Sequence, residues 1–88
     1  MIDSNKIRIG KMIELLERVA SGEIPASVAI SEWPTYVKGD SKTTYTALHE
    51  LHHYSADEDI RSKDPSYAKE QIDTLVWYAS ELIKESKG

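Results

Sequence analysis

DPSYAKEQIDTLVWYASELI, residues 64–83, is the stretch of this chain that decides its fold. Asp64 can cap a helix, and Pro65 suits the first turn, where a backbone N–H would have no partner in any case. The apolar residues that follow recur three and four positions apart, as on one face of a helix. They are Tyr67, Ala68, Ile72, Leu75, Val76, Ala79, Leu82 and Ile83. The sequence therefore predicts a long C-terminal helix with one buried face.

Apolar residues with helical spacing also occur earlier in the chain. An N-terminal helix is expected, which Asp3 or Ser4 can cap and Gly22 can end in the left-handed conformation. Its buried stripe would be Ile9, Met12, Ile13, Leu16, Val19 and Ala20. A short helix is expected from Pro25 to Trp33, because Pro34 restricts the residue before it. The inward residues of this short helix would be Val28, Ala29 and Trp33.

The stretch PTYVKGDSK, residues 34–42, predicts the one real loop. Asp40 or Ser41 is the expected cap of a further helix that runs to about Ala56. One side of that helix would carry Tyr45, Leu48, Leu51, His52 and Ser55. No run of residues alternates as a strand does, and short connections favour antiparallel neighbours. The expected fold is all-α, a compact antiparallel four-helix bundle formed by a single domain over residues 1–88.

The composition argues against several classes of function. The chain has 88 residues, a formal net charge of −4 and no cysteine, so it has neither a disulfide framework nor a thiolate zinc site. No apolar run approaches the roughly 20 residues of a membrane span, and the N-terminal residues do not resemble a secretory signal. We therefore expect a cytoplasmic protein with no membrane contact. The negative charge argues against nucleic acid and favours a basic partner.

The motif HELHH, residues 49–53, matches the zinc-peptidase signature H-E-x-x-H. On a helix, His49 and His53 could hold one zinc ion while Glu50 activates a water molecule. Asp59 would be the third ligand, but Ala56 stands where this type of site uses glycine to turn the chain. We therefore expect surface histidines and no cofactor. A small zinc-dependent peptidase or metal-binding protein stays as the alternative.

No other enzymatic constellation is present in the sequence. The serines lack plausible triad partners and the glycines form no phosphate loop, so the chain is not expected to be an enzyme. No predicted helix has the excess of Lys and Arg that a DNA-recognition helix needs. Trp33, Trp77 and Tyr78 are expected to supply bulk to the core.

Negative charge is concentrated around and just after the histidine motif. Residues 40–59 hold one basic residue, Lys42, and five acidic ones, Asp40, Glu50, Asp57, Glu58 and Asp59. The net charge of this segment is therefore −4, which equals the net charge of the whole chain. At the end of a helix, such carboxylates repel the helix dipole and one another. One explanation is that Asp57 or Asp59 caps a short turn over residues 59–63 and that Arg61 pairs with a neighbour. The other is an acidic docking surface, edged by Tyr54 and Tyr67, for a basic cleft.

Two stretches resemble the colicin D immunity protein family. The first is MIELLERVASGEIPASVAISEW, residues 12–33, in which a helix ends at a small or polar pair and a short helix with an aromatic residue follows. The matching residues are Leu15, Leu16, Ser21, Gly22, Ile24, Pro25, Ala26 and Trp33. The second is ALHELHHYSADEDIR, residues 47–61, in which an aromatic residue precedes an acidic D-x-D cluster. A C-terminal helix of the family's kind, IDTLVWYASELI, follows at residues 72–83.

The resemblance implies an immunity protein that neutralises a cognate tRNA-cleaving ribonuclease toxin. In such a complex an acidic surface occupies the basic cleft that would bind the phosphates of the RNA. Carried over by position, the contact residues would be Asp57, Glu58 and Asp59, with Tyr54 beside them. Helical proximity adds Glu50, Asp64 and Tyr67 to the expected surface. The three histidines, His49, His52 and His53, have no counterpart in the family pattern.

Overall fold

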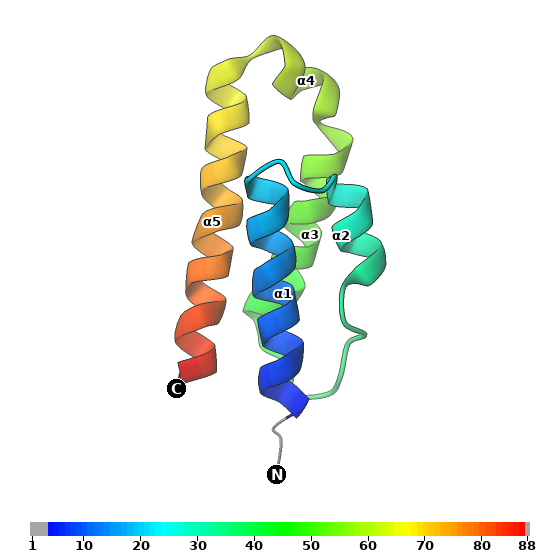
Figure 1. Cartoon of the computed structure of the whole chain (residues 1–88), viewed down its shortest axis with the longest axis vertical. Helices are drawn as coiled ribbons and strands as arrows, with labels where there is room; N and C mark the ends of the chain where they lie inside the picture. Colours follow the sequence, from blue (N-terminus) through cyan, green and yellow to red (C-terminus); the bar gives the residue numbers. More distant parts are fainter. Residues whose placement is uncertain (1–3, 88) are drawn as a thin grey trace.

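Residues 4–87, the part of the chain that the computed structural model describes, form five helices and no strand. The helices are α1 (Ser4–Ala20), α2 (Ala26–Glu32), α3 (Lys42–Ala56), α4 (Glu58–Lys63) and α5 (Pro65–Lys87). Helices α1 and α3 run in one direction, and α2 and α5 run in the opposite one (Figure 1). The predicted all-α bundle is confirmed. It has five helices rather than four, because the expected short turn after α3 is a separate helix, α4.

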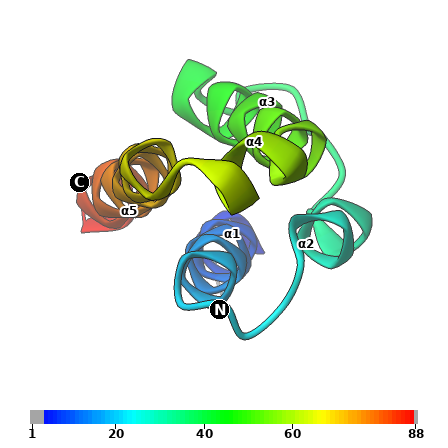
Figure 2. The same ribbon diagram turned by 90° about the horizontal axis from the view of Figure 1, so that it is seen from above.

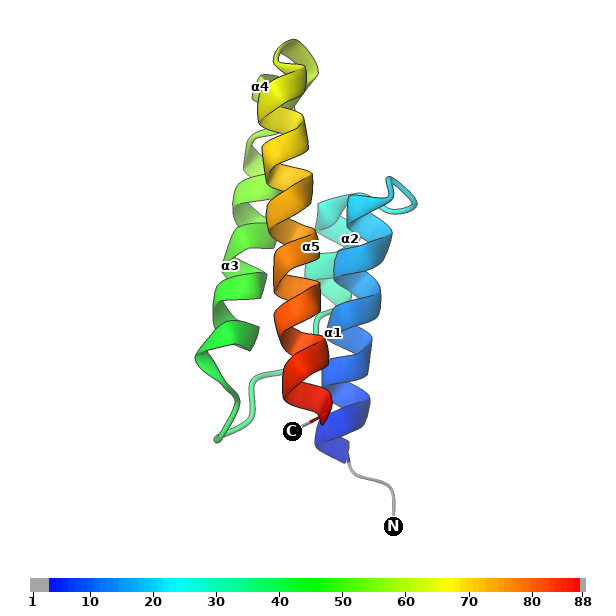
Figure 3. The same cartoon turned by 90° about the vertical axis from the view of Figure 1, so that its left-hand side faces the viewer.

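Helix α5 contacts α1, α3 and α4, and it runs the length of the bundle in front of α1 and α3 (Figure 3). Helix α2 contacts α1 and α3, and α4 connects the ends of α3 and α5 across one end of the bundle (Figure 2). The result is an elongated body of 48 × 22 × 22 Å.

One apolar core runs through the bundle. Its largest fully buried side chains are Met12, Leu15, Leu16, Val19, Leu51, Leu75 and Leu82. Alanines complete it where helices meet, at positions 26, 29, 47 and 79. Four of the six residues predicted for the stripe of the first helix are buried, and Ile13 and Ala20 are partly buried. Of the eight predicted for the last helix, Leu75, Ala79 and Leu82 are buried, whereas Val76 is 50% exposed, so the prediction for Val76 is wrong. Leu15, which the first stripe left out, is also fully buried.

The buried face of α3 differs from the predicted one. Thr44, Ala47 and Leu51 are buried, whereas Tyr45, His52 and Ser55 face solvent. The prediction placed mainly large side chains on the buried face. In the structure, α2 and α3 pack together, and the small side chains Ala29 and Ala47 on these helices are fully buried.

The expectation that all three large aromatic side chains fill the core is also partly wrong. Trp33 and Tyr78 pack against the core, but Trp77 is 55% exposed. Leu75 and Leu82 already fill the buried face of α5, and Trp77 lies two residues beyond Leu75, away from that face.

Most of the predicted helix ends are confirmed. Gly22 follows α1 with a φ of +83°, and the Ser41 hydroxyl accepts a hydrogen bond from the Thr44 amide at the start of α3. The Asp64 carboxylate accepts hydrogen bonds from the amides of Ser66 and Tyr67 at 3.1 and 3.2 Å. The proposed cap Asp3 lies outside the described residues, and no membrane-spanning helix is found within them.

Asp40, the other proposed cap of α3, instead joins the loop before α3 to α1. Its carboxylate accepts two hydrogen bonds of 2.7 Å from the Arg8 guanidinium and one of 3.0 Å from the Val37 amide. Arg8 also donates to the Thr35 carbonyl oxygen at 2.6 Å. The hydrogen bonds from Arg8 hold the pKa of Asp40 below its ordinary value, although burial of the carboxyl group opposes them. Asp40 is therefore a structural residue whose charge is neutralised within the chain.

Candidate binding surface at the α4 corner

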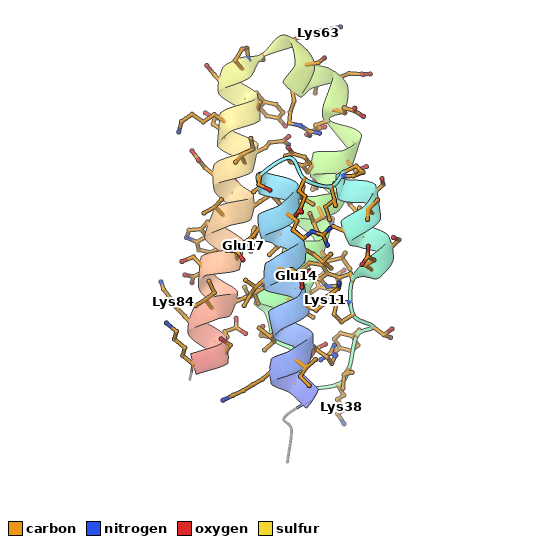
Figure 4. The ribbon with its side chains drawn as sticks, viewed as in Figure 1. Lys11, Glu14, Glu17, Lys38, Lys63 and Lys84 are labelled. Atoms are coloured by element: carbon orange, nitrogen blue, oxygen red, sulfur yellow. The ribbon has the colours of Figure 1, made fainter. Side chains whose placement is uncertain are left out.

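Six of the seven residues predicted to bind a partner lie at one end of the bundle, where α3 ends, α4 crosses and α5 begins, and Glu50 lies further back on α3 (Lys42–Ala56). We call this region the α4 corner, and define it by Glu50, Tyr54, Asp57, Glu58, Asp59, Asp64 and Tyr67. Lys63 marks its tip, and Lys38 and Lys84 lie at the opposite end of the molecule (Figure 4).

Asp57 is the junction between α3 and α4, and its carboxylate is turned toward α5. One carboxylate oxygen accepts a hydrogen bond from the Tyr67 hydroxyl at 2.6 Å and another from the Gln71 side-chain amide at 3.0 Å. The hydrogen bond to Asp57 raises the pKa of Tyr67, with smaller contributions from burial and from the negative charges of Asp57 and Glu50. Asp57 precedes α4, as the expected cap would, but its side chain makes no capping hydrogen bond and instead ties the junction of α3 and α4 to α5.

Arg61 is also directed into the protein. Its guanidinium lies 3.5 Å from the centre of the Tyr54 ring, donates to the Tyr54 carbonyl oxygen, and donates to the Gln71 side-chain oxygen at 2.8 Å. Arg61 does pair with neighbours, as one explanation expected, but they are neutral acceptors and an aromatic ring. Within residues 4–87, Arg61 forms no direct ion pair with a carboxylate.

Gln71 joins these two groups of contacts. Its side chain is 6% exposed, donates to Asp57 and Tyr67, and accepts from Arg61. Sequence reasoning missed this residue. The available signal was its register, because Gln71, Leu75, Ala79 and Leu82 share the buried face of α5. A polar side chain at such a position is expected to have a buried hydrogen-bonding partner.

Replacement of Gln71 by alanine is expected to lower the free energy of unfolding by about 2 kcal/mol, because Asp57 and Arg61 each lose a partly buried partner. Urea unfolding followed by circular dichroism measures the change. The control is Glu70→Ala on the neighbouring exposed position, which is expected to change stability by less than about 0.5 kcal/mol. Equal stability of the two variants would contradict the role of Gln71 in joining the contacts of Asp57 and Arg61.

The structure corrects the expected cost of the clustered carboxylates. Glu58 and Asp59 are in the first turn of α4, and Arg61 and Lys63 are in its last turn. This polarity matches the helix dipole, so the two carboxylates are placed favourably rather than against the end of α3. The expected repulsion between these two carboxylates and a helix dipole is therefore wrong.

The absence of ion pairs at the α4 corner is a separate observation. Within residues 4–87, six carboxylates outside the corner form ion pairs: Glu14, Glu23, Glu32, Asp40, Asp73 and Glu81. None of the five acidic side chains between positions 50 and 64 does so in that part of the chain. Five negative charges against Arg61 and Lys63 leave this segment with a formal charge of −3.

The predicted residues do not form one flat patch. Asp57 contacts Tyr67, and the charge of Glu50 acts on Tyr67, on the side of α5. Tyr54 and Glu58 instead line a shallow pocket with Arg61 on the side of the turn between α1 and α2. Asp59 is exposed on α4, and Asp64 caps α5. Glu58 and Asp59 are thus the predicted carboxylates most available to another molecule.

The histidine motif lies on the exposed side of α3. The Nε2 atoms of His49 and His53 are 3.1 Å apart, and their rings meet edge to face. No group of three potential metal ligands occurs in the described part of the chain, so Asp59 does not join the two histidines. Ala56 is helical, and the chain makes no glycine-type turn after His53. The geometry of an H-E-x-x-H peptidase site is therefore incomplete here.

Comparison with known protein families, with curated proteins and with solved structures found no match for this chain. The resemblance to the colicin D immunity proteins therefore stays a prediction.

Proposed function

We propose that this chain is a non-enzymatic binding protein that docks the α4 corner on a basic partner protein. The observation that carries the proposal is the set of five carboxylates between positions 50 and 64 that form no ion pair within residues 4–87. Most other carboxylates of the bundle have a cationic partner in the same chain. A surface with unbalanced charge attracts an oppositely charged partner and orients it during encounter.

The partner that we propose is the tRNA-cleaving domain of a ribonuclease toxin, as the resemblance to the colicin D immunity proteins implies. A cleft that binds RNA carries Lys and Arg side chains for the phosphates. Glu58 and Asp59 are exposed in the first turn of the short helix α4, which lies at the end of the bundle, where they can enter such a cleft. An immunity protein of this kind would act in the cytoplasm of the cell that makes the toxin.

The buried side of the α4 corner supports this proposal. The contacts of Gln71 with Asp57 and Arg61 hold α4 against α5 before any partner binds. A surface that is already ordered loses little conformational entropy on binding. The zinc-peptidase alternative has less support, because its two histidines have no third ligand in the described residues.

The proposal predicts that a gene directly upstream encodes such a toxin domain, and the experiment uses that domain, purified and also co-expressed in a bacterial host. The chain is expected to restore growth and to stop tRNA cleavage. The double variant Glu58→Lys, Asp59→Lys is expected to bind that domain roughly 10- to 100-fold more weakly, mainly through slower association.

The matched control is the double variant Glu70→Lys, Glu85→Lys. It changes the net charge by the same amount at two exposed carboxylates of α5 that also form no ion pair in the described part of the chain. It is expected to bind almost as tightly as the parent. Equal weakening by both double variants would show that only net charge matters. Tight binding by the Glu58→Lys, Asp59→Lys variant, with its helical content intact, would contradict docking through the α4 corner.

A further inference from the structure

The pair His49 and His53 has a geometry that the proposed docking function does not use. Both side chains are exposed, and they lie one turn apart on α3 with their Nε2 atoms 3.1 Å from each other. In the metal-free protein this distance allows one N–H···N hydrogen bond, with one ring as donor and the other as acceptor.

The same distance is also that between two ligands of a single metal ion. Histidine nitrogens bind zinc at about 2.0–2.1 Å, so two of them at bond angles between tetrahedral and square are about 2.9–3.4 Å apart. The two Nε2 atoms of this pair are already within that range. A metal ion could therefore take the place of this hydrogen bond with little movement of either ring. The donor histidine then carries its proton on Nδ1 instead of Nε2, so that both Nε2 atoms bind the metal as neutral imidazoles.

We propose that His49 and His53 form a two-histidine chelate for one divalent transition-metal ion. Imidazole nitrogens favour Cu²⁺, Ni²⁺ and Zn²⁺ over Mg²⁺ and Ca²⁺, which prefer oxygen ligands. Because both rings are exposed, the remaining coordination positions face water. Residues 50–64, which follow His49 in the chain, carry a formal charge of −3, and this charge favours a bound cation.

His52 supplies a control within the same helix turn. It is exposed like the other two histidines, but its ring is not paired with either of them, and no three potential ligands converge in the described residues. Removal of His52 therefore changes the histidine content by the same amount as removal of His53 but leaves the chelate complete.

Isothermal titration of the full chain with CuCl₂, NiCl₂, ZnCl₂ and MgCl₂ tests the proposal. We expect one Cu²⁺, Ni²⁺ or Zn²⁺ ion per chain, Cu²⁺ to bind most tightly, and no binding of Mg²⁺. His49→Ala and His53→Ala are each expected to weaken Cu²⁺ binding about tenfold or more, since each leaves a single imidazole ligand. His52→Ala is expected to bind Cu²⁺ within about twofold of the parent.

Electron paramagnetic resonance of the Cu²⁺ complex gives a second readout. Coupling to two nitrogen nuclei is expected in the parent and in His52→Ala, and coupling to one in each of the other variants. The proposal is overturned if His52→Ala loses as much affinity as His53→Ala, or if neither His49→Ala nor His53→Ala changes binding. Circular dichroism confirms that the variants remain helical. Because binding to a toxin domain is not measured, the outcome is independent of the proposed function.

Discussion

Replacement of Leu75 by alanine is expected to lower the free energy of unfolding by about 3–4 kcal/mol. Leu75 is fully buried at the middle of α5, the helix that contacts α1, α3 and α4. The substitution removes buried apolar atoms and leaves a cavity that the surrounding helices fill only in part. A domain of this size has a total stability of about 5–15 kcal/mol, so the change is a large fraction of the whole.

The neighbouring position provides the control for this prediction. Val76 is 50% exposed, so Val76→Ala is expected to change stability by less than about 1 kcal/mol. Urea unfolding measures both variants, and Leu75→Ala should also lower the melting temperature by more than about 10 °C. If the two variants were equally stable, the assignment of the buried face of α5 would be incorrect.

Replacement of Asp40 by asparagine is expected to cost about 3 kcal/mol, which is the lower end of the range for breaking a buried ion pair. The Asp40 side chain is 5% exposed and that of Arg8 is 18% exposed. The substitution keeps the size of the side chain but leaves the guanidinium of Arg8 without its counter-charge, and it removes one of the two parallel hydrogen bonds. The loop between α2 and α3 is then held to α1 only by the hydrogen bond from Arg8 to the Thr35 carbonyl oxygen and by the one that remains at position 40.

The same chemical change at an exposed ion pair is the control. Lys69 and Asp73 form such a pair one turn apart on α5, with both side chains largely exposed. Asp73→Asn is expected to cost less than about 0.5 kcal/mol, because solvent screens the pair. A loss from Asp40→Asn no greater than that from Asp73→Asn would contradict the structural role of Asp40.

The contribution of Asp40 should also depend on pH. The hydrogen bonds from Arg8 lower the pKa of Asp40 in the folded protein. The folded state therefore favours the charged form, and the stabilisation is fully present above the unfolded pKa of about 3.9. It is lost as the pH falls through the lower, folded pKa. The difference in stability between the parent and Asp40→Asn should accordingly shrink in acid, as unfolding experiments between neutral and acidic pH would measure.

The helices themselves could be predicted from local sequence. Asp64 and Pro65 specify the start of α5, Gly22 specifies the end of α1, and apolar spacing identifies both helices between those points. Each of these signals acts between residues close together in the chain, through caps, restricted backbone angles and side chains one turn apart. The sequence predicted only a short turn where α4 lies, because a helix of six residues is too short to show a periodic pattern of apolar residues.

The candidate site was only partly predictable. The count of acidic side chains identified the α4 corner, because clustered charge is a property of composition. The number of acidic residues does not predict that Asp40 forms an ion pair with Arg8, 32 positions earlier. It also does not predict that Asp57 accepts hydrogen bonds from Tyr67 and Gln71. These pairings depend on which helices lie side by side.

The sequence by itself determined an all-α chain, the ends of its long helices and an excess of negative charge near the end of α3. Only the tertiary structure decided which face of α3 is buried, that Trp77 stays largely exposed, and which carboxylates have partners inside the protein. The physical reason is that caps and periodicity act within a few residues. Burial and ion pairing depend instead on contacts between segments far apart in the chain, and small side chains such as Ala47 let those segments meet.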